Sequence, residues 1–226
     1  IRSNGDSYMK TDFTQGTVTI TKTTPVDPLK KALKSREQRF PRILNDEEIQ
    51  RLWSVLGEYP NQNFSNVIRL LLLTGSRRSE VINAKWDQFN LEKGIWIKPS
   101  NKTKIKLDVV IPLSSQAIVN LKNMKKVSDS DFLFPEMASG KLRQEFKKAW
   151  ITTCKKASLT SFRPSDLRET YASHLVSSGQ SLYRICKLLG KRVPSSMIPL
   201  VNLSIEQLRQ TTQVFSDKIN KLASTS

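Results

Sequence analysis

Apolar residues recur at intervals of three and four through most of the chain after about residue 40. Positions spaced in this way fall on one face of an α-helix, so the repeat predicts helices that each bury one side. It predicts helices over residues 46–58, 64–74, a short stretch after 78, 114–122, 141–154, 164–177, 181–188 and 204–223.

Two short segments between these helices fit strands instead, over residues 95–98 and 107–111. A further alternating run over residues 17–21 predicts one strand within an otherwise polar N-terminal segment. The pattern therefore indicates a mainly α fold with a small antiparallel β-sheet, of the α+β class.

The first motif with chemical interest is Leu-Leu-Leu-Thr-Gly-Ser-Arg-Arg-Ser-Glu-Val over residues 71–81. Gly75 supplies a left-handed stop to one helix, and either Ser76 or Ser79 is expected to cap the next. A helix start that carries Arg77 favours a bound phosphate, since its free N–H groups and positive end attract anions. The alternative is an ordinary helix hairpin with solvated arginines.

The second motif lies about ninety residues later, over residues 163–175, and begins a helix at Pro-Ser-Asp. Leu167, Tyr171 and Leu175 share one buried face of this helix. Arg168 follows the first of these residues, at the edge of the buried stripe, where packing can hold its guanidinium. A planar guanidinium binds phosphate through two donors more readily than an ammonium does.

Because it contains these two arginine motifs in this order, the segment of residues 40 to 210 resembles the tyrosine recombinase, or phage integrase, family. The resemblance also includes Ile-Leu-Asn-Asp-Glu-Glu-Ile at 43–49, Ile-Pro-Leu-Ser at 111–114, Phe-Leu-Phe-Pro at 132–135 and Leu-Leu-Gly at 188–190. It implies that Arg77 and Arg168 clamp the scissile phosphate. It also places a general-acid lysine of the β-hairpin at Lys104, with the neighbours Lys98, Lys102 and Lys106 as alternatives one register away. A lysine-rich hairpin that only follows a DNA backbone is the simpler interpretation.

Departures from the family pattern concern the proton-transfer and nucleophile positions. Ser165 stands where a histidine is usual, and a serine does not exchange protons near neutral pH. Lys191 stands where histidine or tryptophan is usual. Leu200 occupies the position of the nucleophilic tyrosine, after Pro194 and Pro199, and no tyrosine follows Tyr183. Leucine has no oxygen that could attack phosphorus.

Three parts are expected along the chain. Residues 1–35 are an N-terminal arm or linker remnant, since the helical DNA-clamping domain usual in the family is missing or truncated. Residues 36–203 form an integrase-like catalytic-type domain. Residues 204–226 form a C-terminal helix whose apolar stripe docks either on the chain's own core or, as the resemblance implies, on a neighbouring protomer.

The charge of the chain points to a polyanionic partner. It has 37 Lys and Arg against 20 Asp and Glu, a net charge of +17 and a pI near 10.0, which indicates double-stranded DNA bound through phosphates. No stretch of about 18 apolar residues is present, so a membrane role is not expected. Phosphate contacts beyond the clamp are expected from basic side chains around the two boxes, namely Arg78, Lys98, Lys102, Lys106, Arg163 and Arg192.

Several cofactor classes are excluded by residue type and spacing. Cys154 and Cys186 lack metal-ligand spacing, and His174 is the single histidine, which indicates no metal site and fits a packed helix-face residue. Neither Gly-Lys pair has the pattern of a nucleotide-binding loop, so no cofactor is expected. Unpaired cysteines favour a reducing compartment, so we expect a cytoplasmic, nucleoid-associated protein of a bacterium or phage.

Three hypotheses follow. The leading one is a DNA-binding pseudo-recombinase that represses, bridges or assembles with itself or with an active relative. The second is an active site-specific recombinase with a displaced or externally supplied nucleophile. The third is a protein-interaction scaffold that does not use DNA.

Overall fold

The computed structural model describes residues 41–99, 108–125, 130–138, 143–191 and 203–224. These residues belong to a compact unit that extends from Pro41 to Ser226. The strand predicted over residues 17–21 lies outside the described residues. Within the described part, no helix is both long and apolar enough to cross a bilayer.

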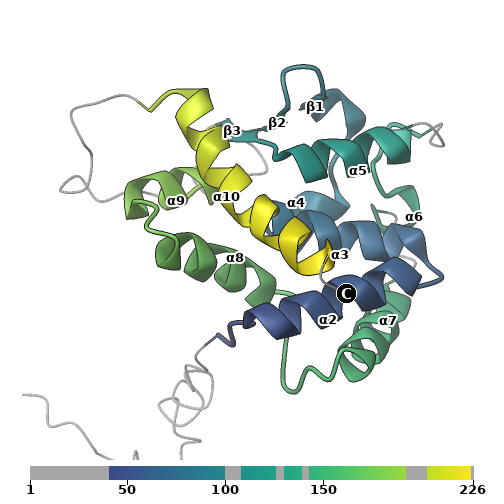
Figure 1. Ribbon diagram of the computed structural model, residues 1–226. Helices are drawn as coiled ribbons and strands as arrows, with labels where there is room; N and C mark the ends of the chain where they lie inside the picture. The colour runs from purple at the N-terminus through teal and green to yellow at the C-terminus, as the bar shows by residue number, and fades with distance from the viewer. Residues whose placement is uncertain (1–40, 100–107, 126–129, 139–142, 192–202, 225–226) are drawn as a thin grey trace, which may run out of the picture. The chain divides into compact units, whose positions relative to one another are not determined.

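The described chain is mostly helical, as the apolar spacing predicted (Figure 1). The longer helices begin and end within a few residues of their predicted bounds. The helices are α2 (Asp46–Glu58), α3 (Gln62–Thr74), α4 (Arg78–Ile82), α5 (Ser115–Lys125), α6 (Pro135–Ala138), α7 (Arg143–Lys156), α8 (Asp166–Ser177), α9 (Leu182–Leu188) and α10 (Ile205–Ser224), with a 3-10 turn η1 (Trp86–Gln88).

The small antiparallel sheet is also confirmed, in the strand order β1 (Phe89–Asn90), β2 (Ile95–Lys98) and β3 (Val109–Pro112). In β2, Trp96 and Lys98 share the inward face, because alternate residues of a strand point to the same side. This register directs a lysine side chain into the protein.

Helix α3 is the centre of the fold and packs against α2, α4, α5, α8 and α10. A helix surrounded on all sides must be apolar around its whole circumference. The run from Leu70 to Leu73 meets this requirement, since all four side chains are at most 1% exposed. The buried helix therefore gives its C-terminal end a fixed position, and both arginine motifs are built around that end.

Gly75 ends α3 in the left-handed conformation, with φ +59°, and its N–H donates to the Leu71 carbonyl. A side chain at this position would collide with its neighbours. An added Cβ would lie 2.4 Å from Tyr171 Cδ1 and 2.9 Å from Leu189 Cδ2. Glycine is thus required both for the turn and for the close approach of α8 and the end of α9.

The C-terminal helix α10 packs on its own chain, crossing α8 and α9 (Figure 1). Phe215 is 1% exposed and meets the Tyr171 ring edge-on, at 5.6 Å between centroids. Lys218 Nζ lies 2.6 Å from Asp46 Oδ1 of α2. Of the two alternatives left open by the sequence, this structure has the stripe covered within the chain, except at Ile205, which is 46% exposed.

Candidate phosphate-binding site

The two arginine motifs meet at the end of α3. Arg77 is the N-cap residue of α4, directly after the turn at Gly75 and Ser76. Arg168, from the first turn of α8, donates through Nη1 to the Gly75 carbonyl at 2.8 Å and through Nη2 to the Leu189 carbonyl at 2.6 Å. One guanidinium therefore joins the ends of α3 and α9 and lies next to the turn that carries the other.

Arg168 is only 8% exposed, and no acid among the described residues forms an ion pair with it, which is unusual for a buried charged side chain. Its burial, and then the charge of Arg77, lower the pKa of Arg168, while Glu80 and Glu169 oppose this shift. The positive charges of the two arginines therefore repel each other. An anion placed there would relieve that repulsion.

Arg77 is held by the acid of its own motif. Its Nη1 lies 2.7 Å from Glu80 Oε1, and its backbone N–H donates to Glu80 Oε2 at 3.0 Å. Glu80 is thus the side chain that satisfies the free N–H at the start of α4. The predicted cap by Ser76 or Ser79 is wrong, because the Ser76 hydroxyl lies between Thr74 Oγ1 and a buried lysine instead.

That buried lysine is Lys98. Its Nζ lies 2.8 Å from Ser76 Oγ, 2.7 Å from Glu80 Oε2 and 4.3 Å from the centre of the Trp96 ring. The residue is 6% exposed. Burial lowers the pKa of Lys98 to about 8, with Glu80 opposing and the charges of Arg168 and Arg77 adding to the shift.

The pKa of Glu80 responds to the same network. Burial alone would raise the pKa of this carboxyl, but the charge and hydrogen bond of Lys98 and the two bonds from Arg77 outweigh it and lower the pKa. Glu80 is therefore ionised beside three cations. The cluster of Arg77, Lys98, Arg168 and Glu80 carries a net charge of about +2 at neutral pH, which favours an anionic ligand.

Other predicted site residues lie at the surface. Ser165 is the exposed N-cap residue of α8, and Arg163 is exposed just before it. Arg78 is exposed with its guanidinium 5.3 Å from the centre of the Phe146 ring. Lys191 is exposed after α9. The remaining predicted site residues, Lys102, Lys104, Lys106, Arg192 and Leu200, lie outside the described residues.

Of the two tyrosines in the second half of the chain, Tyr171 is not presented as a nucleophile. Tyr171 is fully buried, and its hydroxyl lies 2.8 Å from Thr212 Oγ1 of α10. Burial raises the pKa of Tyr171 to about 12, although the bond to Thr212 opposes this shift. Tyr183 is half-buried in α9, with the Lys187 ammonium 5.6 Å from its ring centre.

His174 is a packed helix residue, as its sequence context predicted. Its Nε2 lies 2.7 Å from the Leu44 carbonyl, and its Nδ1 lies 3.0 Å from Lys218 Nζ. The two ring nitrogens thus connect α8 to α10 and to the segment that precedes α2. Within the described part of the chain, no group of three or more His, Cys, Asp or Glu is placed to hold a metal ion.

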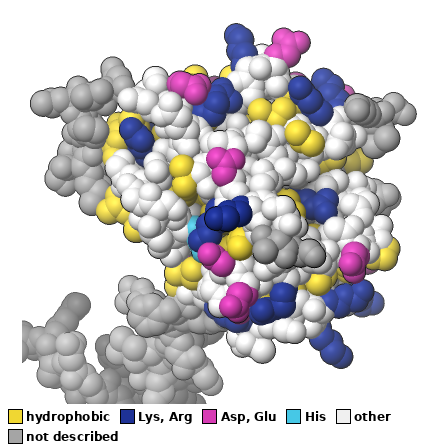
Figure 2. All heavy atoms as spheres, in the orientation of Figure 1, with side chains coloured by type: hydrophobic (Ala, Val, Ile, Leu, Met, Phe, Trp, Pro, Cys, Tyr) yellow, Lys and Arg dark blue, Asp and Glu magenta, His cyan; other side chains and the backbone are white. Residues whose placement is uncertain are grey.

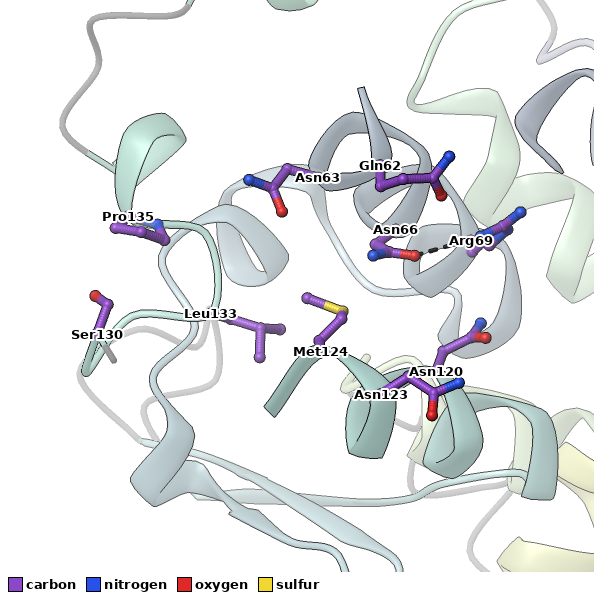
Figure 3. Close-up of a pocket in the computed structure, with 10 residues that line it drawn as sticks. All are labelled: Gln62, Asn63, Asn66, Arg69, Asn120, Asn123, Met124, Ser130, Leu133 and Pro135. Carbon is purple, nitrogen blue, oxygen red and sulfur yellow. Dashed lines mark hydrogen bonds between the residues drawn. The ribbon is translucent and has the colours of Figure 1, made fainter. Parts of the chain in front are cut away.

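A cavity of about 700 Å³ opens elsewhere, between the start of α3 and α5. Figure 3 shows Asn66 and Arg69 of α3 facing Asn120 and Asn123 of α5 across it. Half of its lining residues are neutral amides, and the one charged group among the lining residues, Arg69, is bonded to the Leu56 carbonyl and to Asn66. This cavity contains neither arginine of the cluster and offers no acid or base.

The arginine cluster can bind and polarise a phosphate. Guanidinium groups donate hydrogen bonds and neutralise charge that develops on phosphate oxygens, but they have no lone pair with which to attack phosphorus. The fold and the site together define a mainly helical domain with a small antiparallel sheet and a cluster of cations at the ends of α3 and α9.

The chain belongs to the Phage integrase family, whose sequence profile matches residues 42–197. The match includes both arginine motifs and ends shortly before Leu200. The Integrase of Salmonella phage P22 is 29% identical over 166 residues, which are 67% of this chain and 41% of that protein.

Solved structures agree on the fold. The XerA recombinase has a TM-score of 0.56 at 19% identity, over 84% of this chain and 65% of that one. The XerH recombinase bound to its difH substrate has a TM-score of 0.53 at 19% identity, over 79% of this chain and 52% of that one. The chain thus spans less than two thirds of these relatives, and the likeness shows the fold of a tyrosine recombinase catalytic domain.

The sequence predicted the two arginines as phosphate ligands and Lys98 as a residue that contacts DNA. It predicted no role for Glu80. The Arg77 and Glu80 spacing of three residues within a helix start was the available signal for their pairing. The alternation of β2, with Lys98 in phase with Trp96, was the available signal for the buried lysine.

Proposed function

We propose that this protein binds duplex DNA by clamping a backbone phosphate between Arg77 and Arg168, and that it does not cut DNA by itself. The observation that carries the proposal is the fixed position of Arg168. Its guanidinium is buried, charged and bonded to the Gly75 and Leu189 carbonyls, which belong to the residues directly after α3 and α9. Holding an arginine in this way beside a second one is costly unless an anion completes the site.

DNA is the anion that the rest of the chain supports. The net charge of +17 attracts a polyanion, and the exposed Arg78, Arg163 and Lys191 offer further phosphate contacts. The structurally similar XerH recombinase was solved with its DNA substrate. A cytoplasmic protein with these contacts would associate with the nucleoid.

The inability to cut rests on Leu200. By its distance from Gly190, this residue takes the place of the nucleophilic tyrosine in the family resemblance. Tyr171 does not replace it, since its hydroxyl is buried against Thr212. Without a nucleophile the covalent phosphotyrosine intermediate does not form, so Lys104, Ser165 and Lys191 would serve only to bind phosphate. Such a protein would act by occupying sites or by assembling with an active recombinase.

The test incubates the chain with nicked suicide duplexes that carry candidate or genomic sites. Native mobility shift across a salt series measures binding, and a denaturing gel detects covalent adducts. We expect a salt-sensitive shift and no adduct. A band that survives denaturation would instead establish an active recombinase, and no shift at any salt concentration would favour the protein scaffold.

Arg77→Gln is the variant that connects binding to the clamp. Arg77 is partly exposed, so its loss is expected to weaken binding about tenfold while the fold stays intact. Lys122→Gln is the matched control, because it removes the same charge from the exposed face of α5, which packs on α3 and α10 rather than on α4. Equal losses in the two variants would overturn the clamp.

A further inference from the structure

A lysine buried directly behind the two arginines is unexpected in a site built to bind phosphate. Lys98 is 6% exposed, so its ammonium does not itself reach a DNA backbone. Transfer of an ammonium from water to the interior is unfavourable unless the group is paired. Its position therefore calls for a role inside the site.

The hydrogen bonds define that role. Glu80 uses Oε1 for the Arg77 guanidinium and Oε2 for the Lys98 ammonium, at 2.7 Å each. The carboxylate is thus shared between an inner and an outer cation. Ser76, on the turn between the two motifs, accepts a second bond from Lys98 at 2.8 Å and so fixes the ammonium against the turn.

We propose that Lys98 is a positioning residue for the phosphate clamp, which neutralises Glu80 from inside the fold so that Arg77 keeps an uncompensated charge for DNA phosphate. This inference rests on the proposed DNA binding and names a new element of it. Without Lys98, the full charge of Glu80 would fall on Arg77, and the ion pair would compete with the phosphate.

Charge counting makes the idea testable. The cluster of Arg77, Arg168, Lys98 and Glu80 has three cations and one anion. Lys98→Met keeps a side chain of similar length in the interior but lowers the net charge of the cluster by one. In this variant the Glu80 carboxylate keeps only its ion pair with Arg77. Adding Glu80→Gln removes the competing carboxylate and restores the net charge. The double variant should therefore bind DNA better than Lys98→Met.

The experiment measures the Kd of wild type, Lys98→Met, Glu80→Gln and the double variant for one duplex at fixed salt. We expect Lys98→Met to bind about five- to tenfold more weakly, and the double variant to recover at least half of that loss on a logarithmic scale. A lysine with a purely structural role would give a double variant as weak as Lys98→Met or weaker. Circular dichroism of each variant checks that it is folded.

A pH profile gives a second readout. Lys98 faces Glu80 and Arg77 of α4 and Arg168 of α8, and a bound phosphate adds a negative charge beside it. Phosphate binding then favours the protonated lysine, so wild-type affinity should fall as the pH rises above about 8, while the affinity of Lys98→Met should change less. Parallel profiles would overturn the proposal.

The outcomes separate the two proposals. If wild type does not bind DNA, the proposed function fails. If wild type binds and Arg77→Gln weakens binding, but Lys98→Met binds like wild type, only the positioning role of Lys98 fails.

Discussion

Gly75 is the residue on which both arginines depend, because its left-handed turn directs the chain into α4 and its carbonyl receives Arg168. Gly75→Ala should destabilise the fold by about 2–5 kcal/mol, which combines roughly 1–2 for the left-handed conformation with roughly 1–3 for the collision with Tyr171 and Leu189. Urea denaturation measures this difference in the free energy of unfolding.

Gly179→Ala is a matched control, since Gly179 also has a positive φ, of +75°, but no atom within 4 Å of an added Cβ. It should show only the conformational cost. Equal losses in the two variants would mean that the close approach of α8 and α9 to Gly75 contributes nothing to stability.

Lys98 makes stability depend on pH in a defined direction. Its pKa is lowered to about 8 in the folded protein from 10.5, so between these values the unfolded chain binds more protons. Stability should therefore rise with pH from about 8 to about 10, relative to a protein without this lysine. Below about pH 8 both states hold the proton and the slope vanishes.

Chemical denaturation of wild type and Lys98→Met at matched pH values tests this expectation. The free energy of unfolding of wild type should increase relative to that of the variant as the pH rises through this window. A difference that is constant, or that shrinks with rising pH, would show that the ammonium is not destabilised by burial.

The residues of the clamp differ in how far the sequence reveals them. Arg77 and Arg168 lie in motifs whose order along the chain is specific to the family. The structure places both arginines around the turn at Gly75. Lys98 was predicted to contact DNA because a lysine on a strand is usually solvated, whereas the structure buries its side chain. Its burial depends on Glu80 and Ser76, which approach from another element, and such pairing is invisible in a local pattern.

At the scale of elements, α10 is the helix whose packing partner the sequence left undecided. Phe215 of α10 is buried against Tyr171 and His174 of α8. Phe215→Ala should cost about 3–5 kcal/mol of stability, as deletion of a buried aromatic side chain does elsewhere. Because the contact lies within one chain, the unfolding midpoint should not depend on protein concentration.

Ile205→Ala, at the exposed start of the same helix, is the control and should change stability by less than about 0.5 kcal/mol. If α10 docks on a neighbouring protomer in solution, Phe215→Ala would instead weaken self-association, and wild-type stability would rise with concentration. Sedimentation analysis beside the denaturation series distinguishes these outcomes.

Long elements were predictable and short ones were not. The bounds of α2 and β2 coincide with those predicted, because each is set by a regular pattern and, in α2, by the Asn45 cap. The short η1, β1 and α6 were missed. Segments of two to four residues bury too little of their own surface to leave a periodic signal, and contacts with the rest of the fold determine them.

At the scale of the whole molecule, the face that carries α10 can be compared with the arginine cluster. On the side that carries α10, lysine and arginine side chains are interspersed with aspartate and glutamate (Figure 2). The arginine cluster at the ends of α3 and α9 has one acid against three cations. Local charge at that site, more than the net charge of the chain, is therefore expected to orient the protein on DNA.

The number of DNA phosphates that the protein contacts shows whether residues outside the clamp of Arg77 and Arg168 also bind DNA. Each neutralised phosphate contributes about −0.9 to the slope of log K against log salt concentration on duplex DNA, so a clamp that holds one phosphate would by itself give a slope near about −1. With +17 net charge and exposed basic residues such as Arg78 and Arg163 beside the clamp, we expect a slope steeper than about −4. Arg77→Gln should make it shallower by about one, whereas Lys122→Gln should leave it unchanged. A wild-type slope near about −1 would confine DNA contact to the clamp, and a slope near zero would exclude phosphate binding as the basis of any complex.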